Sequence, residues 1–429
     1  MCALPFRGAL FDLDGTLLDS MYVWMEVDDR FFAERGMVTP SDYAKSLAGM
    51  SYREMAEYTK ERFRLTETWE ELVDIWMRMA LEEYNLRVPL KSGSKEYLTY
   101  LKSQGVKLAV TTVQPPDMFI ECLKRNGIYD LFDAFCSAGE HGKEDGALYL
   151  RAAGQLGIPP HECAVFEDIY EGIVGAKRVG MKAYCIEEPA SRHIRNKIAP
   201  IADAMLDTLW DMQKYHPWHR RCVIFTAYCE SPQGAYRPMP DDMILCADGG
   251  RNIADALGVH ADCVLGDFDS SEMPVGGNVL RYPVEKDDTD TMLCIRRALE
   301  QGHRNILLIG GLGGRFGHTM ANIQALLFAH AHGANIALCD GNTRIHILEC
   351  GTLTLHREYD TVSVFALSPV CAGVCLYGLQ YPLRNATLTN DFPIGCSNHF
   401  AEDTAFVAVR EGVLLVIEEN EGDARGSAP

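Results

Sequence analysis

Two pairs of aspartates in this chain share the spacing Asp-x-Asp. Asp12 and Asp14 occur in "FDLDGT", and Asp267 and Asp269 occur in "GDFDS". In an extended strand alternate side chains point the same way, so each pair can direct two carboxylates into one pocket. Two carboxylates at that separation repel each other unless a cation lies between them. Because Mg²⁺ prefers a few carboxylates together with phosphate oxygens, both pairs predict magnesium-dependent chemistry on phosphates.

Three further segments accompany the first pair. The apolar run "LAVTT" ends in the hydroxyl of Thr112, Lys143 precedes an expected helix, and "VFED" ends in Glu167 and Asp168. This order of acidic pair, hydroxyl, lysine and second acidic pair resembles the haloacid dehalogenase-like phosphatases. The resemblance covers about residues 7 to 212, and "FDLDGTLLDS" and "FEDIYEGIVGAKRVGM" are its most specific parts.

The resemblance implies a role for each of these residues. Asp12 would be the nucleophile that forms an aspartyl-phosphate, and a carboxylate suits that role because it is ionised at pH 7. Asp14 would protonate the leaving alcohol and then activate water, which calls for a pKa nearer neutrality than that of Asp12. Thr112 and Lys143 would hold the phosphoryl oxygens, although the family's prolines around "GKPxP" are replaced by "GKEDG". The implied magnesium ligands are Asp12, Asp14, Glu167 and Asp168.

The second pair has different neighbours. Upstream, Asp248 stands in "CADGG", and downstream "EKDDTDT" forms a dense acidic loop. The stretch "IGGLGGRFGHTMAN" joins a glycine-rich turn to an expected helix, which suits phosphate binding by backbone N–H groups. It lacks the G-K-[ST] ending of a Walker A loop and is no clean G-x-G-x-x-G fingerprint. Acidic clusters with such a cradle and one arginine fit metal-bound nucleoside triphosphate chemistry.

These motifs in order, followed by "YGLQYPL" and "CSN" in a β-rich tail, resemble thiamine pyrophosphokinase. The resemblance covers about residues 222 to 420. It implies that the hydroxyl of thiamine attacks the β-phosphorus of ATP and that AMP leaves, without a covalent enzyme intermediate. The family commonly reads "GGRxDH", whereas here Gly317 stands before His318. A half that binds without turnover is therefore one alternative.

By motif, the second site would combine magnesium ligands, phosphate-binding cations and thiamine contacts. Asp267, Asp269 and either Asp287 or Asp290 would hold Mg²⁺ on the triphosphate, with Asp248 beside them. The thiamine contacts usually come from the partner subunit, which implies a homodimer through the C-terminal half. The remaining ligand-binding residues are Lys286 and Arg315 for phosphate charge, His318 and Asn322 at the glycine-rich turn, and Ser397 and Asn398 for the thiamine pyrimidine.

The elements that must position these residues follow from hydrophobic periodicity. Residues 20–88 show helical stripes, and alternating helices and strands run from about 94 and again from 222. Such alternation predicts parallel sheets with ligands at the carboxyl ends of the strands. From about 344 short alternating runs indicate an all-β, sandwich-like segment. We expect a haloacid dehalogenase-like hydrolase domain of α/β class at 1–212, with an inserted helical cap at about 18–88. A linker at 213–221 would join it to a kinase domain, also of α/β class, at 222–343. A β domain at 344–421 and a tail at 422–429 would follow.

Composition limits the classes of function. The chain has 429 residues, 47% of them hydrophobic, and a formal net charge of −20. Such a charge argues against nucleic acid as the main partner, and no apolar run approaches the ~20 residues of a membrane span. The 15 cysteines include no C-x-x-C pair, so neither a disulfide framework nor a zinc ribbon is indicated, and we expect a reducing cytoplasm.

The leading hypothesis is a bifunctional enzyme that joins a Mg²⁺-dependent phosphatase to an ATP-dependent thiamine pyrophosphokinase. The fusion suggests consecutive steps, in which thiamine monophosphate is cleaved to thiamine and thiamine is converted to the diphosphate. Two alternatives stay open. The first half could be a phosphatase or mutase for an unrelated small phosphate ester, or one half could be a catalytically idle binding or dimerising module.

Overall fold

The chain folds into two compact units that divide between Leu206 and Asp207. The structure is a computed structural model. Within the part of the chain that it describes, no helix is both long and apolar enough to cross a membrane. The described residues are 4–40, 42–47, 50–138, 142–216, 218–266, 279–281 and 288–421.

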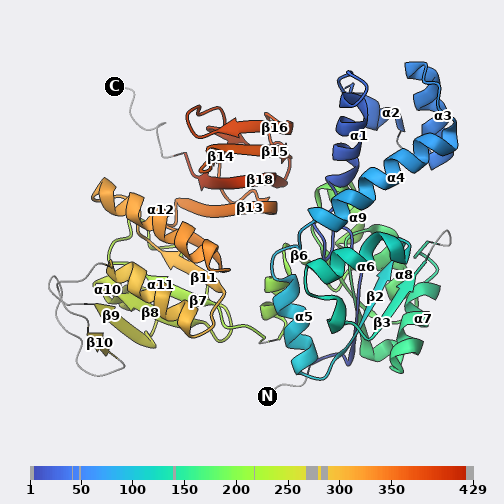
Figure 1. The fold of residues 1–429 in the computed structure, drawn as a ribbon. Helices are drawn as coiled ribbons and strands as arrows, with labels where there is room; N and C mark the ends of the chain where they lie inside the picture. The colour runs from blue at the N-terminus through green and yellow to red at the C-terminus, as the bar shows by residue number, and fades with distance from the viewer. Residues whose placement is uncertain are drawn as a thin grey trace. The chain divides into compact units, whose positions relative to one another are not determined.

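The first unit is built on a six-stranded sheet with the order β3-β2-β1-β4-β5-β6 (Figure 1). Every neighbouring pair in it is parallel. Short apolar runs such as "GALF" and "CAVFE" are buried throughout, as a sheet covered by helices on both faces requires. Because β2 and β4 flank β1 on opposite sides, the carboxyl ends of these three strands meet where the strand order reverses. The strands are β1 Gly8–Phe11, β2 Lys107–Thr112, β3 Ala134–Ser137, β4 Cys163–Glu167, β5 Lys182–Ile186 and β6 Ala204–Leu206, and the helices among them are α5 Ser94–Ser103, α6 Pro116–Arg125, α7 Ala147–Leu156, α8 Tyr170–Arg178 and α9 Arg195–Ile198.

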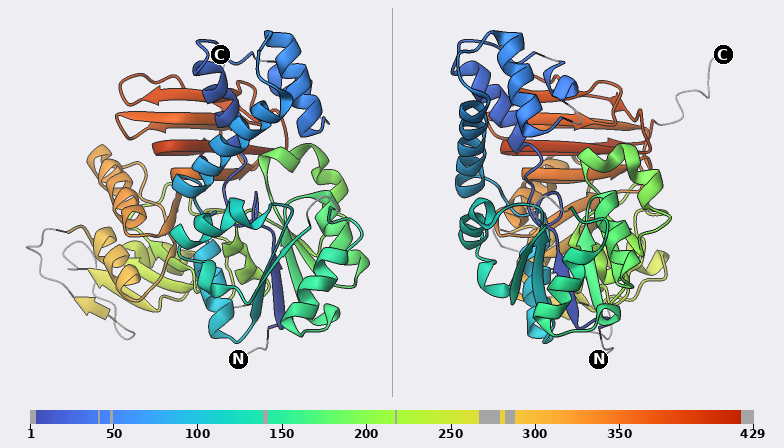
Figure 2. Two further views of the ribbon diagram at one scale, coloured as in Figure 1. Left: turned by 45° about the vertical axis from the view of Figure 1, so that its right-hand side comes forward. Right: turned by 90° about the vertical axis from the view of Figure 1, so that its right-hand side faces the viewer.

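Four helices inserted after β1 form the cap. Figure 2 shows them gathered at one end of the first unit. Ser51 and Thr68 start two of them with capping boxes, in which each side chain accepts a bond from the third helical N–H. The cap has its own aromatic core, in which Phe32 contacts Tyr43 and Phe63 edge to face. The helices are α1 Val23–Ala33, α2 Tyr43–Leu47, α3 Tyr52–Phe63 and α4 Trp69–Leu86.

The second unit begins with another parallel sheet. Its strand order is β10-β9-β8-β7-β11-β12, so β8 and β11 flank β7 and the order reverses there, as it does at β1. Helix α12 is one of those that follow these strands, and its Ala325, Leu326 and Ala329 are buried in the core. The elements are β7 Cys222–Phe225, β8 Met243–Ala247, α10 Gly250–Ala256, β9 Cys263–Gly266, β10 Val279–Arg281, α11 Asp290–Glu300, β11 Asn305–Ile309, α12 Phe316–Ala331 and β12 Asn335–Cys339.

The β-rich segment continues this sheet. Strand β12 pairs antiparallel with β13, so the α/β part and the β-rich part form one mixed sheet of 12 strands among the described residues. Runs that we expected as separate short strands are joined: β13 continues through a bulge between Glu349 and Gly351, and β18 pairs with it on both sides of that bulge. The strands are β13 Thr343–His356, β14 Thr361–Ala366, β15 Val370–Tyr377, β16 Leu383–Thr389, β17 Asn398–His399 and β18 Thr404–Glu419.

The stretch expected as a linker makes specific contacts within the second unit. A 3₁₀ turn, η5 Leu209–Lys214, has its own capping box at Thr208. The rings of Trp210 and Trp218 stack at 5.1 Å between centroids, and Gln213 donates to the carbonyl of Pro240 at 3.1 Å. Gln213 and Trp218, in the stretch expected as a linker, thus make contacts within the second unit.

Candidate functional sites

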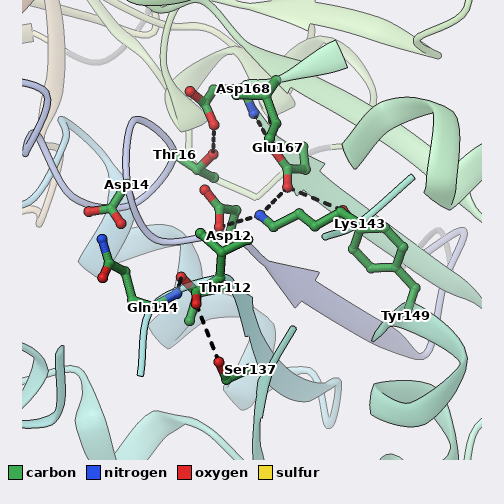
Figure 3. A network of polar contacts seen from close by, with 12 residues as sticks. Asp12, Asp14, Thr16, Thr112, Gln114, Ser137, Lys143, Tyr149, Glu167 and Asp168 are labelled. Atoms are coloured by element: carbon green, nitrogen blue, oxygen red, sulfur yellow. Dashed lines mark hydrogen bonds and ion pairs between the residues drawn. The ribbon is translucent and has the colours of Figure 1, made fainter. Parts of the chain in front are cut away.

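The carboxyl ends of β1, β2 and β4 bring four predicted site residues of the first unit together (Figure 3). Asp12 follows β1 directly, and its N–H donates to the carbonyl of Phe166 in β4 at 3.0 Å. Thr112 is the last residue of β2, Glu167 is the last residue of β4, and Asp168 follows it. The register of the parallel sheet thus places residues from three distant segments at one edge.

Lys143 joins this group from the loop before α7. Its ammonium lies 2.5 Å from Oδ1 of Asp12 and also bonds Oε1 of Glu167. The hydroxyl of Tyr149 donates to the same Glu167 oxygen at 3.1 Å. All four side chains are buried, and a buried charge requires such compensation. The lysine and carboxylates therefore form one hydrogen-bonded chain across the site.

Burial also controls protonation in this cluster. Desolvation raises the pKa of Asp12 to about 8, although the Lys143 ammonium opposes the shift. Burial and the neighbouring Glu167 carboxylate likewise raise the pKa of Asp168 well above its usual value. For Lys143, burial alone would lower the pKa, but the carboxylates of Asp12 and Glu167 raise it above the ordinary value. Lys143 therefore stays charged, while Asp12 and Asp168 hold their protons to higher pH than ordinary aspartates do in the metal-free site.

The chemistry of the donor set fits a divalent cation. Asp12, Glu167 and Asp168 each offer a carboxylate oxygen, and these oxygens lie within 4.8 Å of one another. Asp168 also accepts a bond from Thr16 at 3.4 Å. The backbone of Gly15 passes so close that an added Cβ would lie 2.5 Å from Oδ2 of Asp168. Mg²⁺ bound to these oxygens would favour the ionised form of Asp12 and Asp168 and would polarise a phosphoryl group.

Thr112 is oriented by its own turn. Its Oγ1 accepts a hydrogen bond from the N–H of Gln114 at 3.1 Å. Because that bond uses the oxygen as an acceptor, the hydroxyl hydrogen is the part that can be donated to a phosphoryl oxygen.

Asp14 lies outside the carboxylate trio, the group formed by Asp12, Glu167 and Asp168 (Figure 3). Its Oδ1 accepts from the hydroxyl of Ser20 at 2.6 Å and from the hydroxyl of Tyr84, a residue of the cap helix α4. The sequence motif contained Ser20 without assigning it a role, and no local pattern pointed to Tyr84, which is 70 residues from Asp14.

Two glycines of α8 were also missed as parts of the site. A Cβ on Gly172 would lie 2.3 Å from the carboxyl carbon of Glu167, and one on Gly175 would lie 2.0 Å from the carbonyl oxygen of Lys143. Only glycine permits the helix to approach both residues this closely. The available signal was the Gly-x-x-Gly spacing in "YEGIVGA", which puts both positions on one helical face.

A buried ion pair lies behind the carboxylate trio. Lys91, from the segment after the cap, bonds the carboxylate of Glu188. Burial raises the pKa of Glu188 to about 7 even though the lysine opposes the shift. Glu188 also lies against Gly15, where an added Cβ would be 3.2 Å from its Cγ. This pair therefore supports the loop that carries the acidic motif.

In the second unit, Asp248 follows β8 and faces the start of the acidic "GDFDS" motif. Its φ is 44°, in the left-handed region, and its N–H donates to the carbonyl of Leu265 at 2.7 Å. An added Cβ on Gly266 would lie 3.1 Å from the Cβ of Asp248. Asp290 is the first residue of α11. The predicted ligands Asp267, Asp269, Lys286 and Asp287 lie outside the described residues.

The glycine-rich turn follows β11 and leads into α12. Gly310 and Gly311 have φ of +80° and +93°, which favours glycine. Asn322, predicted as a ligand contact, donates from Nδ2 to the carbonyl of Gly311 at 2.8 Å and so holds the turn. Arg315 is the residue before the first turn of α12, and both Arg315 and His318 are exposed. An exposed cation beside a helix N-terminus is a suitable arrangement for binding phosphate.

Ser397 and Asn398 are differently placed in the β-rich segment. Ser397 is exposed, has φ of 51°, and its N–H donates to Oγ of Ser363 at 3.0 Å. The buried amide of Asn398 accepts from the N–H of Tyr381 at 2.9 Å and donates to its carbonyl at 2.8 Å. Asn398 therefore fixes the backbone that carries the exposed Tyr381 ring.

Comparisons with known protein families divide the chain as its two units do. Residues 9–186 match the haloacid dehalogenase-like hydrolases. Residues 240–338 match the catalytic domain of thiamin pyrophosphokinase, and residues 344–414 match its vitamin B1 binding domain.

Individual relatives cover one unit each. YhcW of Bacillus subtilis (strain 168), a phosphatase by name, is 31% identical over 186 residues, which are 42% of this chain and 83% of that protein. The validoxylamine A 7'-phosphate phosphatase of Streptomyces hygroscopicus subsp. limoneus is 30% identical over 214 residues, 49% of this chain and 98% of that protein. The crystal structure of thiamine pyrophosphokinase from Bacillus subtilis aligns with 22% identity and a TM-score of 0.44, covering 47% of this chain and 100% of that one.

Proposed function

Because the first half of this chain belongs to the haloacid dehalogenase-like hydrolases and the second half to the thiamin pyrophosphokinases, we propose that both halves act on the same vitamin. The first half releases phosphate from thiamine monophosphate. The second half then transfers a diphosphoryl group from ATP to the thiamine produced, with AMP as the other product. The buried Asp12–Lys143–Glu167 chain of contacts is the observation that best supports hydrolysis in the first half.

Hydrolysis proceeds in two steps on this chain's own residues. A carboxylate oxygen of Asp12 forms a bond to phosphorus as the bond to the ester oxygen breaks, and Asp14 gives that oxygen its proton. Asp14 then takes a proton from water, whose oxygen attacks phosphorus and releases Asp12. Thr112 and Lys143 bind the phosphoryl oxygens in both steps. The net reaction converts ester and water to alcohol and phosphate.

The second half requires no covalent intermediate. Backbone N–H groups of the glycine-rich turn and the guanidinium of Arg315 would bind the triphosphate, and acidic residues including Asp290, with Asp248 beside them, would hold its magnesium. Asn322 keeps the turn in its binding conformation through the bond to Gly311. The hydroxyl of thiamine then displaces AMP at the β-phosphorus.

Thiamine monophosphate as the first substrate is supported by the fusion and by an aromatic pair in the cap. The rings of Trp24 and Tyr52 lie 5.8 Å apart between centroids, and Tyr52 is 46% exposed. Trp24 stands in the first turn of α1, which starts with a bond from Val23 N–H to the carbonyl of Ser20, the partner of Asp14. Besides burial, the charge of Asp14 helps raise the pKa of Tyr52. Aromatic faces near an acidic side chain suit a flat cationic ring such as the thiazolium of thiamine.

The test is to incubate the purified protein with thiamine monophosphate and Mg²⁺, with and without ATP, and to follow phosphate, thiamine diphosphate and AMP. We expect phosphate in both samples and thiamine diphosphate only with ATP. Asp12→Asn should abolish phosphate release while AMP formation from thiamine plus ATP continues. If no phosphate is released from thiamine monophosphate, the two-step proposal is wrong, and if both activities vanish in the variant, the two sites are not independent.

A sugar phosphate is the second candidate substrate of the first half. Relatives of this half include the phosphorylated carbohydrates phosphatase of Thermotoga maritima, 26% identical over 178 residues, and hexitol phosphatase B of Escherichia coli, 24% identical over 213 residues. Comparing kcat/KM for thiamine monophosphate and for a panel of sugar and hexitol phosphates separates the two candidates. In addition, Trp24→Ala should raise the KM for thiamine monophosphate more than the KM for a sugar phosphate.

The active protein is proposed to be a homodimer through its C-terminal half. Large apolar side chains are exposed on the β-rich segment beside Ser397: Tyr381 is 65%, Phe392 65% and Ile394 60% exposed. Such clustering is typical of a surface that a partner covers. Sedimentation or light scattering should give twice the mass of the chain, and a monomer that retains full kinase activity would refute this part of the proposal.

A further inference from the structure

The cap contributes a phenol that reaches Asp14. Tyr84 lies in the last turn of α4 and is 2% exposed. Its hydroxyl donates to Oδ1 of Asp14, and the hydroxyl of Ser20 donates to the same atom at 2.6 Å. We propose that Tyr84 is a positioning residue for Asp14, which with Ser20 reserves Oδ1 as an acceptor and leaves Oδ2 to carry the transferred proton.

This arrangement matters when the leaving group departs. A carboxylate oxygen has two acceptor sites, and two hydroxyl donors fill those of Oδ1. As the phosphorus–oxygen bond breaks, the proton moves from Oδ2 to the ester oxygen and Asp14 becomes negatively charged. Hydrogen bonds to an ionised group are stronger than those to a neutral one, so both donors stabilise Asp14 more after the transfer than before it. The gain is greatest for an alcohol that needs protonation to leave.

Tyr84 is suited to be a permanent donor. Burial, together with the charge of Asp14, holds the pKa of this phenol well above its ordinary value, so the hydroxyl keeps its proton. A second tyrosine of the cap, Tyr43, is equally buried but pairs with Thr59 at 2.7 Å, away from Asp14.

The position of Tyr84 is set by the hydrolase core. Arg125, at the end of α6, donates to the carbonyl of Tyr84 at 3.4 Å and also to that of Val88. The amide of Asn126 donates to the same Val88 carbonyl at 3.1 Å. The end of α4 is thus tied to the domain that carries the nucleophile, and the phenol is fixed relative to Asp14.

The experiment rests on the proposed phosphatase activity and uses two aryl phosphates that differ by one nitro group on the leaving group. p-Nitrophenyl phosphate has a leaving group that departs without protonation, whereas phenyl phosphate needs more help from the acid. For Tyr84→Phe we expect kcat/KM to fall about 10-fold on phenyl phosphate and less than about 3-fold on p-nitrophenyl phosphate, since about 1.4 kcal/mol of hydrogen bonding to a charged group is lost. Tyr43→Phe, the matched control, should change neither value by more than about 2-fold.

Ser20→Ala keeps the test sharp if Tyr84→Phe folds poorly, because it removes the other donor to Oδ1 and should show the same preference for the better leaving group. Equal losses on both probes, or no loss on either, would overturn the proposal. The outcome for thiamine monophosphate is separate. A wild-type protein that turns over both probes but not thiamine monophosphate contradicts the proposed substrate and leaves the role of Tyr84 intact, whereas one that turns over neither the probes nor thiamine monophosphate refutes both.

Discussion

Replacing Asp12 by Asn should stabilise the metal-free first unit while abolishing its hydrolysis. Asp12 is buried beside Glu167 and Asp168, and its pKa is raised from 3.8 to about 8, chiefly by burial. An unfolded aspartate releases its proton near pH 3.8, whereas the folded one keeps it until about pH 8. The folded state therefore binds more protons across this window, and its stability falls as pH rises from 3.8 to 8.

The size of the effect follows from the same shift. One pH unit corresponds to about 1.36 kcal/mol, so the interval from 3.8 to pH 7 amounts to at most about 4 kcal/mol. Asparagine resembles the protonated carboxyl in shape and carries no charge. We expect Asp12→Asn to exceed the wild type by about 2–4 kcal/mol at pH 7 in EDTA, and by almost nothing near pH 4.

Unit-specific stability can be measured by amide hydrogen exchange of peptides from β1, across a pH series corrected for intrinsic exchange. Magnesium should stabilise only the wild type, by about 2.7 kcal/mol at 100 times its Kd. Asp133→Asn is the matched control with the opposite sign. Partial burial alone would raise the pKa of Asp133, but the Leu108 N–H and Lys102 lower it, so this variant should lose up to about 1 kcal/mol at pH 7. A metal-free Asp12→Asn protein that is less stable than wild type at pH 7 would refute the reasoning.

Three further outcomes are expected in the second unit. Gly317→Asp introduces the residue common in the family at a position with no atom within 4 Å of the new Cβ. It should stabilise the start of α12 by about 0.5–1 kcal/mol and raise the rate of AMP formation. An unchanged rate would show that the other acids suffice. Asn398→Ala frees the Tyr381 backbone, so the KM for thiamine should rise about 10-fold and that for ATP less than about 2-fold, as initial-rate kinetics would measure. Burial lowers the pKa of His216 and His219 to about 4, so the unfolded chain binds more protons than the folded one between pH 4 and 6.5. The free energy of unfolding, measured by urea titration at each pH, should therefore fall by about 1–2 kcal/mol per histidine as the pH is lowered from 6.5 to 4. The fall should be smaller in His216→Gln.

The fold class was predictable because hydrophobic periodicity reports which faces are buried. Both parallel sheets, the helical cap and the β-rich end follow from that pattern, and the structure confirms them. What the pattern could not show is that β12 pairs with β13. A strand at the edge of one domain and a strand that opens the next have the same local signature, and only their pairing joins them into one sheet. The sequence of β13 and of β18 predicts separate short strands for a similar reason: bulge residues such as Gly351 resemble turns in sequence.

Some residues of the candidate site were likewise predictable from the local pattern, and others depend on tertiary packing. Residues that follow strands, such as Asp12 and Asp168, could be expected at one sheet edge because parallel topology brings strand ends together. Tyr84 could not, because its approach to Asp14 depends on how the end of α4 packs against α6, and that packing leaves no periodic trace. The sequence shows Gly172 and Gly175, but their role depends on the Glu167 side chain and the Lys143 backbone that lie against them, which the sequence does not show.

The Asp-x-Asp spacing predicts two carboxylates around one cation, and in the first unit this holds only in part. Asp12 lies with Glu167 and Asp168 around a point that suits a cation, whereas Asp14 gives Oδ1 to two hydroxyls and lies outside the trio. Alternate residues share a direction only while the chain stays extended, and here β1 ends at Phe11, before either aspartate. Equal spacing therefore predicts a shared neighbourhood but not a shared ligand. In the second unit the spacing follows β9 in the sequence, and Asp248, which follows β8, lies against Gly266, the last residue of β9. Asp248, at the end of a neighbouring parallel strand, is accordingly well placed to lie beside a cation that the aspartates of "GDFDS" would hold.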